Sequence, residues 1–268
     1  MTSRSRRLAT KAALVTRVAA SVLLMTFTSI AILPIAVVTL FSARRLYAAI
    51  VTRLARLTLR MFGLQVQVHG ALFPRTQTLY VSNHSSTIDL FVLAALGLPN
   101  TRFFLWGALQ KFIPLAILAR LMGTFFTVSQ QRPEERRRIF AAAAWTLSRT
   151  GESVYLSPEG RRITTGEIGP FNKGAFHLAT SLGAPIIPLY FFIPREIDPG
   201  IGYCAGSGLV QVYVKPPIDT RTWRVEDVVA NKEAVRMLFV EWHRQAHEWV
   251  PAEVPRHAAA EPVPATAN

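Results

Sequence analysis

The stretch TLYVSNHSSTIDL, residues 78–90, leads from a short apolar run to a histidine and then, five positions later, to an aspartate. The run 78–82 has the composition of a β-strand, and the residues from Asp89 onward have that of a helix. His84 is therefore expected just past a strand, where catalytic groups are often found. A neighbouring carboxylate fixes the tautomer of an imidazole and makes it a better proton acceptor. Asp89 is close enough in sequence to turn back onto His84.

The same alternation of elements continues along the chain. Short β-rich runs alternate with helical patterns, which predicts an α/β domain with a mixed, largely buried sheet and flanking helices. The runs read as strands are 66–68, 78–82, 102–106, 124–128, 153–157, 185–192 and 209–214. The helices are expected near 89–97, 109–122, 133–149, 173–183 and 224–249.

Charge is distributed unevenly along the 268 residues, which carry a formal net charge of +14. No Asp or Glu precedes Asp89, whereas residues 1–88 hold eleven Arg and Lys. Nucleic acid is one partner for such a segment. However, the basic residues bracket apolar helices, and this arrangement fits an anionic lipid surface better. We therefore expect a membrane lipid bilayer as a partner, and no nucleic acid.

The uncharged segment 18–41 is long enough to cross a bilayer as a helix. Pro34 would kink it, so a re-entrant segment is an alternative to a span. Five basic residues lie on each side, so the positive-inside rule does not fix its orientation. A cleaved signal peptide is disfavoured, because the apolar run is too long and no small-residue cleavage site follows.

Residues 46–62 are expected to form a second helix. Its apolar residues recur at intervals of three and four, and Arg53, Arg56 and Arg60 recur similarly elsewhere on its surface. This pattern is typical of a helix in the membrane interface, with arginines toward lipid phosphates. Packing against the protein's own core would give the same pattern. With 18–41, this helix predicts an N-terminal two-helix membrane anchor.

These observations divide the chain into three parts: a membrane-associating segment 1–62, an α/β domain 63–250 and a disordered tail 251–268. The tail holds four prolines and several alanines, a composition that does not build a core. Cys204 is the single cysteine, which excludes an internal disulfide, and no Cys/His cluster resembles a zinc site.

A second group of polar residues lies in YLSPEGRRITTGEIGPFNKGAFHLA, residues 155–179. A turn at 158–160 follows a β-rich run and brings Arg161 and Arg162 to an edge of the sheet. Paired arginines can clamp an anionic oxygen, and Glu159 is placed to orient one of them. Lys173 and Gly174 open the next helix, whose amino-terminal N–H groups also attract anions. A solvated charged loop is the alternative.

Together these pieces resemble the glycerolipid acyltransferase family, whose members include 1-acylglycerol-3-phosphate acyltransferases. His84 and Asp89 match the first motif of that family, a histidine and an aspartate separated by four residues. Gly123 and Phe126 match part of the second. The third motif and its downstream extension, and then the fourth, correspond to residues 157–162, 170–176 and 186–189. The resemblance covers about residues 65–215, in the same order and spacing.

The resemblance implies a function and a site. The implied reaction moves a fatty acyl group from acyl-CoA or an acyl carrier protein to the hydroxyl of a lysolipid, most simply 1-acylglycerol-3-phosphate, giving phosphatidic acid in phospholipid biosynthesis. His84 would be the base and Asp89 its partner, with no cofactor and no metal beyond the thioester co-substrate. The active site would lie at the membrane on the cytoplasmic side, where acyl thioesters are made.

The substrate-binding residues implied by the resemblance come from the third motif and its extension. Arg162 and Lys173 would hold the acceptor's head group, while Glu159 and Gly160 would shape the turn. Arg161 stands where the family has threonine. The family's arginine at the end of the second motif is Ser129 here.

A lysine that often precedes the second motif is also missing, since Gly107 or Ala108 occupies its place. Both missing cations are linked in the family with the acceptor's phosphate. Another lysophospholipid or a lyso-aminolipid is therefore an alternative acceptor, and a non-catalytic lipid-binding protein is an alternative class. A serine hydrolase is disfavoured because the chain has no GxSxG motif. His243 and His247 lack the HExxH pattern of a zinc site.

Overall fold

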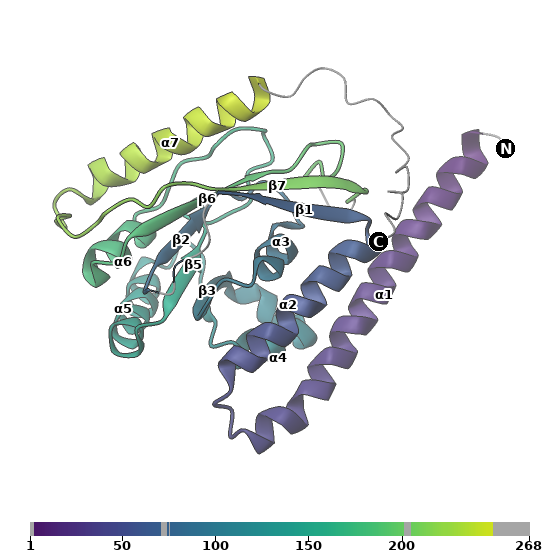
Figure 1. The fold of residues 1–268 in the computed structure, drawn as a ribbon, viewed down its shortest axis with the longest axis horizontal. Coiled ribbons are helices and arrows are strands. Elements are labelled where there is room, and N and C mark those ends of the chain that lie inside the picture. Colours follow the sequence, from purple (N-terminus) through teal and green to yellow (C-terminus); the bar gives the residue numbers. More distant parts are fainter. Residues whose placement is uncertain (1–2, 71–73, 75, 201–204, 249–268) are drawn as a thin grey trace, which may run out of the picture.

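A seven-stranded sheet forms the centre of the fold in the computed structural model, which describes residues 3–70, 74, 76–200 and 205–248 (Figure 1). Its strand order is β1-β7-β6-β2-β5-β3-β4. Only β6 and β7 pair antiparallel among these neighbours, which confirms the predicted mixed sheet. The strands are β1 (Leu64–His69), β2 (Leu79–Ser82), β3 (Thr101–Trp106), β4 (Phe125–Thr127), β5 (Ser153–Leu156), β6 (Ile186–Phe192) and β7 (Gly208–Val214).

Helices cover both faces of this sheet, because successive side chains of a strand point to opposite faces. Leu79 and Val81 of β2 pack in the cluster that includes residues of α5 (Pro133–Thr150), α6 (Gly174–Leu182) and α7 (Val228–Glu248). Tyr80 between them packs in the cluster of α2 (Arg44–Met61) and α3 (Asp89–Leu96). Every residue of β2, β5 and β6 is buried. The largely buried sheet with flanking helices is therefore confirmed.

One predicted helix, 109–122, is interrupted. A 3-10 turn covers Gly107–Lys111, Phe112 is extended, and α4 begins only at Ile113. Pro114 explains the break, because proline suits the first turn of a helix and lacks the N–H that a helix interior needs. The predicted helix 224–249 likewise begins later, at Val228, as α7.

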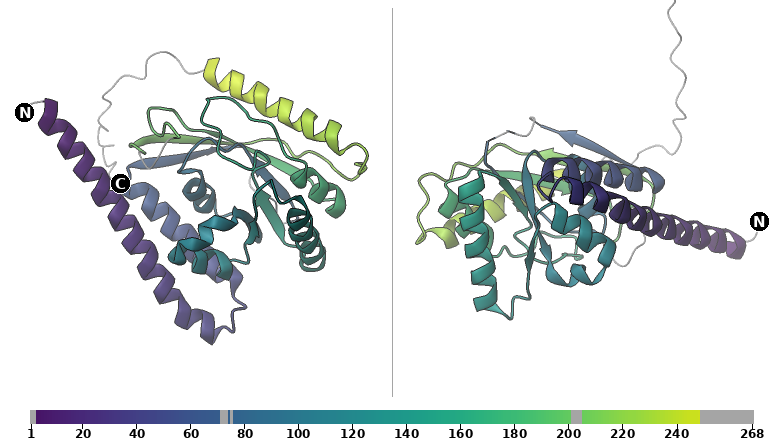
Figure 2. Two further views of the ribbon diagram at one scale, coloured as in Figure 1. Left: turned by 180° about the vertical axis from the view of Figure 1, so that it is seen from behind. Right: turned by 90° about the horizontal axis from the view of Figure 1, so that it is seen from below.

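The N-terminal helix α1 (Ser3–Val38) runs without interruption through Pro34. It contains Lys11–Val38, a stretch long and apolar enough to cross a membrane. Only 28% of the most apolar 18-residue part of this stretch is buried. One side of α1 packs on α2 and α4, and its amino-terminal part projects beyond the rest of the fold (Figure 2). Many apolar side chains on α1 and in the turn after it are exposed, among them Leu23, Phe27, Ile30, Val38, Leu40 and Phe41.

The second helix, α2, is part of the core. Leu54 packs in the cluster with α1 and α4. Ala55 and Leu59 pack with α3 in the cluster that contains Tyr80 of β2. Packing against the protein, which the sequence left open for this helix, therefore accounts for its buried side. Leu46 and Leu57 remain 43% and 45% exposed. Of the two helices predicted as an anchor, only α1 is mostly apolar and exposed.

The predicted boundary at residue 62 falls between α2 and β1, and the tail 251–268 lies outside the described residues.

Candidate active site

His84 lies in the loop that joins β2 to α3, at the carboxyl end of the buried centre of the sheet. Its Nδ1 is 2.7 Å from Oδ2 of Asp89, the first residue of α3. The predicted contact between these two side chains is therefore present. The same carboxylate oxygen accepts the N–H groups of Ser85 at 2.9 Å and Ser86 at 3.0 Å, which fixes the carboxylate at the start of the helix.

The contact determines how His84 is protonated. An ionised carboxylate only accepts hydrogen bonds, so Nδ1 carries the proton and Nε2 keeps its lone pair. Asp89 is 4% exposed at its side chain, whereas His84 is 35% exposed. The aspartate is therefore enclosed by protein, while the imidazole can reach an incoming molecule. The arrangement gives a positioned base whose free nitrogen faces away from its carboxylate.

Glu159 holds the backbone of His84. Its buried carboxylate accepts the N–H of His84 at 2.5 Å and the N–H of Gly169 at 2.8 Å. Burial raises the pKa of Glu159 to about 7, while these two backbone donors act in the opposite direction. Both oxygens of Glu159 accept backbone N–H groups, and among the described residues Glu159 makes no ion pair with an arginine. That Glu159 orients an arginine stays a prediction.

Two further contacts tie the loop to neighbouring segments. The carbonyl of His84 accepts the N–H of Ile163 at 2.7 Å. The side-chain amide of Asn83 donates to the carbonyl of Phe191 at 2.9 Å and accepts its N–H at 2.8 Å. Because β6 and the segment after β5 both contribute, the position of His84 depends on these two segments as well as on its own loop.

Asp198 is a residue of this site that sequence reasoning missed. Its buried carboxylate accepts the hydroxyl of Ser86 at 2.6 Å and the N–H of Thr87 at 3.1 Å. It also accepts the N–H of Gly200 at 2.8 Å. No local pattern around Asp198 indicates this role, since its partners in the His84 loop, Ser86 and Thr87, lie more than one hundred residues earlier in the chain.

The predicted cationic residues lie on the loop after β5 and at the start of α6. Arg162 is exposed and donates to the hydroxyl of Thr87, which brings it to the His84 loop. Arg161 and Lys173 are also exposed. Lys173 directly precedes α6. Within the described part of the chain, neither Arg161 nor Lys173 makes a side-chain hydrogen bond or ion pair. Their positive charge is available to a ligand.

Gly160 forms the turn that precedes these arginines. Its φ of +67° favours glycine, and a Cβ at this position would lie 2.7 Å from the amide nitrogen of Asn172. That amide donates to the carbonyls of Pro158 and Glu159 at 3.0 and 2.9 Å. The predicted turn is therefore a tightly closed structural element.

The two positions where the resemblance leads one to expect a cation are neutral for different reasons. A Cβ at Gly107 would lie 2.8 Å from the carbonyl oxygen of Thr127, so the backbone leaves no room for a side chain. Ser129 follows β4, and its neighbour Gln130 lies beside Gly160. A Cβ added at Gly160 would be 3.3 Å from the side-chain amide nitrogen of Gln130. A neutral amide thus stands beside the turn of the third motif.

His243 and His247 lie side by side on α7. In the described residues, they belong to no group of three or more His, Cys, Asp or Glu side chains that could hold a metal ion. Both ring nitrogens of His243 are hydrogen-bonded, to the hydroxyl of Tyr190 and the carbonyl of Gly166, each at 2.9 Å. The two imidazole rings pack edge to face, with centroids 4.3 Å apart.

Comparison with known proteins indicates which family the chain resembles. Residues 65–191 match a family model described as acyltransferase. The chain is 32% identical over 188 residues to the 1-acyl-sn-glycerol-3-phosphate acyltransferase alpha of Bos taurus, which covers 66% of this chain and 62% of the relative. It is 30% identical over 168 residues to a chloroplastic 1-acyl-sn-glycerol-3-phosphate acyltransferase of Brassica napus, covering 62% and 48%. The chain thus spans less than two thirds of the length of these relatives.

A solved structure shares the fold. The crystal structure of PlsC, the 1-acyl-sn-glycerophosphate (LPA) acyltransferase of Thermotoga maritima, matches with a TM-score of 0.67. The match covers 87% of this chain and 98% of that one, at 17% sequence identity. Taken together, the matched domain, the relatives and the motifs support the glycerolipid acyltransferase family.

Proposed function

We propose that the protein is an O-acyltransferase that moves a fatty acyl group from an acyl thioester to the free hydroxyl of a lysolipid. The leading acceptor is 1-acylglycerol-3-phosphate, which would give phosphatidic acid. The observation that carries the proposal is the 2.7 Å contact between His84 and Asp89. It supplies a base with a free nitrogen, which a hydroxyl needs because it is a weak nucleophile. The names of the relatives support the choice of acceptor.

The proton moves through His84 in both halves of the reaction. Nε2 takes the proton of the acceptor hydroxyl as its oxygen attacks the thioester carbonyl. The C–S bond then breaks, and the departing thiolate recovers that proton from the imidazolium. Asp89 stabilises the imidazolium and keeps the tautomer that leaves Nε2 free. The thioester is already activated, so no acyl-enzyme is required. A positioned base of this kind contributes about 10²–10⁴ in rate.

Arg162 and Lys173 are proposed to bind the phosphate of the acceptor. Arg162 donates to the hydroxyl of Thr87, in the loop that carries His84, and Lys173 is exposed at the start of α6. A guanidinium binds phosphate through two parallel hydrogen bonds. Arg161 is a further candidate, because it is exposed on the same loop.

The proposed location is a membrane, with the active site on the cytoplasmic side. The exposed apolar surface of α1 supports bilayer contact, because a soluble surface rarely leaves so large an apolar patch open. Acyl-CoA and acyl carrier protein, the two proposed donors, are made on the cytoplasmic side.

An acyl-transfer assay on the full-length protein in detergent tests the proposal. Labelled acyl-CoA or acyl carrier protein is offered with 1-acylglycerol-3-phosphate, a second lysophospholipid and a lyso-aminolipid in competition. We expect His84→Ala and Asp89→Asn each to lose at least about a hundredfold in turnover. His177→Ala, which removes an exposed imidazole on α6, is the matched control and should remain active.

The acceptor is tested in the same mixture. Arg162→Ala should raise KM for 1-acylglycerol-3-phosphate more than for the phosphate-free lipid, because a hydrogen bond to a charged group contributes about 1.5–3 kcal/mol. If the lyso-aminolipid is preferred by the unmodified protein, the neutral Gly107 and Ser129 have changed the acceptor and our assignment is wrong. Near-normal turnover in His84→Ala would instead favour a lipid-binding role.

A further inference from the structure

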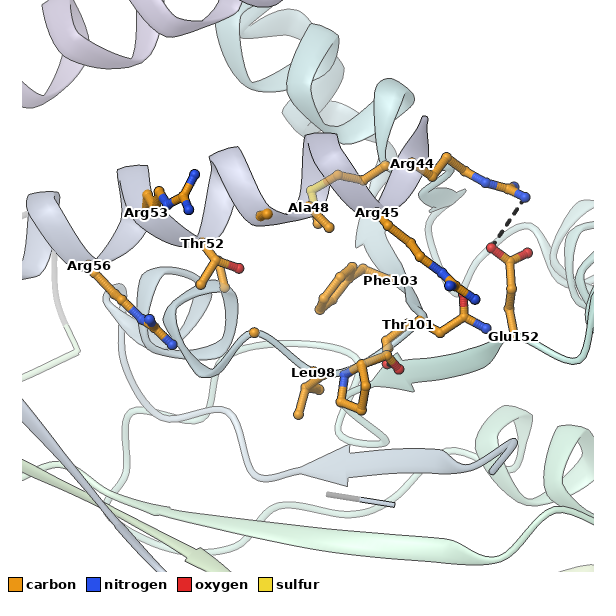
Figure 3. Close-up of a pocket in the computed structure, with 16 residues that line it drawn as sticks. Arg44, Arg45, Ala48, Thr52, Arg53, Arg56, Leu98, Thr101, Phe103 and Glu152 are labelled. Carbon is orange, nitrogen blue, oxygen red and sulfur yellow. Dashed lines mark hydrogen bonds and ion pairs between the residues drawn. The ribbon is translucent and has the colours of Figure 1, made fainter. Parts of the chain in front are cut away.

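A second polar site lies between α2 and the chain that joins α3 to β3 (Figure 3). It is a cavity of about 580 Å³, which we call the α2 hollow. Four arginines of α2 line it, together with small, polar and apolar residues, the apolar ones including Leu98, Phe103 and Met122. The other lining residues used below are Arg44, Arg45, Ala48, Ala49, Thr52, Arg53, Arg56, Asn100 and Glu152.

The α2 hollow lies at the opposite end of the sheet from His84. Asn100 immediately precedes β3 and Glu152 immediately precedes β5, so both mark the amino ends of their strands. His84 follows the carboxyl end of β2, which runs parallel to β5. A ligand in the α2 hollow would therefore be distinct from the proposed substrates at His84.

The sequence of α2 explains the shape of the hollow. Residues spaced by three and four on a helix share one face, and Ala48, Ala49 and Thr52 occupy the middle of this face. Their small side chains leave space between α2 and the α3–β3 connection. Arginines stand at both ends of the face, and Arg45 and Arg56 extend from α2 toward that connection (Figure 3).

The positive charge of the hollow is not balanced by its single acidic residue. Glu152 is already paired with Arg44 at 3.3 Å and with Arg102 at 2.7 Å. Arg56 donates through Nε to the carbonyl of Ala95 at 2.9 Å. Among the described residues, no carboxylate lies within ion-pair distance of Arg45, Arg53 or Arg56. These three arginines therefore line the hollow without a carboxylate partner in the part of the chain that the structure describes.

The surroundings of the hollow indicate what kind of anion it takes. Leu46 and Leu57 of the same helix are about half exposed, and α1, with its exposed apolar side chains, packs against α2. A ligand with an anionic head and an apolar body would meet both surfaces. Basic pockets beside membrane helices bind phosphate head groups in this way, and guanidinium groups match phosphate oxygens in a bidentate manner.

We propose that the α2 hollow binds the phosphate of an anionic membrane-lipid head group, with Arg45, Arg53 and Arg56 as its ligands. The inference does not rest on the proposed acyl transfer, because binding is measured without turnover. The lipid would hold α2 against the bilayer surface beside α1.

The experiment uses full-length protein in neutral-detergent micelles. Phosphatidylglycerol is titrated into the micelles, and its binding and the thermal midpoint of unfolding are measured. Phosphatidylcholine and inorganic phosphate are titrated in parallel. We expect phosphatidylglycerol to bind and to raise the midpoint, and the double variant Arg45→Gln/Arg53→Gln to bind it about thirtyfold more weakly, since each arginine at an anionic surface contributes about fivefold.

Two variants separate the hollow from general surface charge. Arg60→Gln/Arg138→Gln removes the same charge at exposed positions that do not line the hollow, and should weaken binding by less than the hollow variant. Ala49→Phe keeps every charge and fills the hollow, and should weaken binding by about tenfold or more. Equal losses in both double variants, or full binding by Ala49→Phe, would overturn the proposal. If inorganic phosphate raises the thermal midpoint as much as phosphatidylglycerol does, the occupant of the hollow is free phosphate and not a lipid.

Discussion

The two ends of the central sheet are built in opposite ways. At the carboxyl end, the loop that carries His84 is fixed by Glu159, Asn83 and Asp198, which are all buried and hydrogen-bonded to backbone or hydroxyl groups. At the amino end, the α2 hollow presents four arginines, of which Arg44 alone is paired with a carboxylate of the described residues. Proton transfer requires positions fixed to a fraction of an ångström, whereas charge attraction tolerates movement. The difference matches the two kinds of chemistry that we propose.

Among changes that leave His84 and Asp89 in place, Glu159→Gln should lower turnover the most, because it breaks the constraint at the carboxyl end. A glutamine offers one acceptor oxygen where the carboxylate offers two, so either His84 or Gly169 loses its partner. A buried donor left unpaired costs about 1–3 kcal/mol, and displacement of the base adds to the loss of turnover. We expect at least a thirtyfold loss of acyl transfer, read as about 2 kcal/mol in the barrier.

Glu167→Gln is the control for this change, since Glu167 is an exposed glutamate on the same loop. It should retain both activity and stability. If Glu159→Gln also retains them, the buried carboxylate does not position the base.

The pH dependence of stability should distinguish the same two ends. Burial raises the pKa of Glu159 from 4.5 to about 7, so the folded chain keeps a proton that the unfolded chain has released between these values. The stability contributed by this group is fully present below pH 4.5 and is lost as pH rises through 7. The shift corresponds to about 3 kcal/mol. Denaturant unfolding at a series of pH values measures it.

The variant Glu159→Gln removes the titrating group and should show a flatter stability profile between pH 4.5 and 7. Arg45→Gln/Arg53→Gln should keep the profile of the unmodified protein, because arginine does not titrate in this range. Parallel profiles for the unmodified protein and Glu159→Gln would mean that folding does not raise the pKa of Glu159.

The smallest effect is expected at the amino end. Without anionic lipid, Arg45→Gln/Arg53→Gln should change the free energy of unfolding by no more than about 0.5 kcal/mol, because neither side chain has a described acidic partner. Urea unfolding in neutral detergent measures this. A large loss would show that the arginines hold α2 in place, and the contrast between the two ends would disappear.

Local patterns were sufficient to predict the strands and the His84–Asp89 contact. The buried strands are short apolar runs bounded by polar residues, and the two site residues are five positions apart. Local patterns did not reveal the role of Asp198 or the true partners of Glu159. Their hydrogen bonds join residues 112 and 75 positions apart in the chain, and no neighbouring residue encodes such a pairing.

The environment of α2 was also beyond sequence reasoning. Leu46, Leu54, Leu57 and Leu59 have the same side chain, yet the first and third are about half exposed and the others are buried. A helical apolar stripe can face lipid or protein equally well, so only the packing of α1, α3 and α4 separates them. The break at Phe112 was missed because the apolar period continues across it.

The contacts that fix His84 also impose an order on biosynthesis. Glu159, Phe191 and Asp198 all follow His84 in the chain, whereas α1 is complete by Val38. A ribosome adds about 5–20 residues per second. The apolar helix therefore leaves the ribosome on the order of ten seconds before the last tether of the histidine loop. The nascent chain can meet a membrane while its base is still unconstrained, and the proposed activity would begin only after Asp198 has been synthesised.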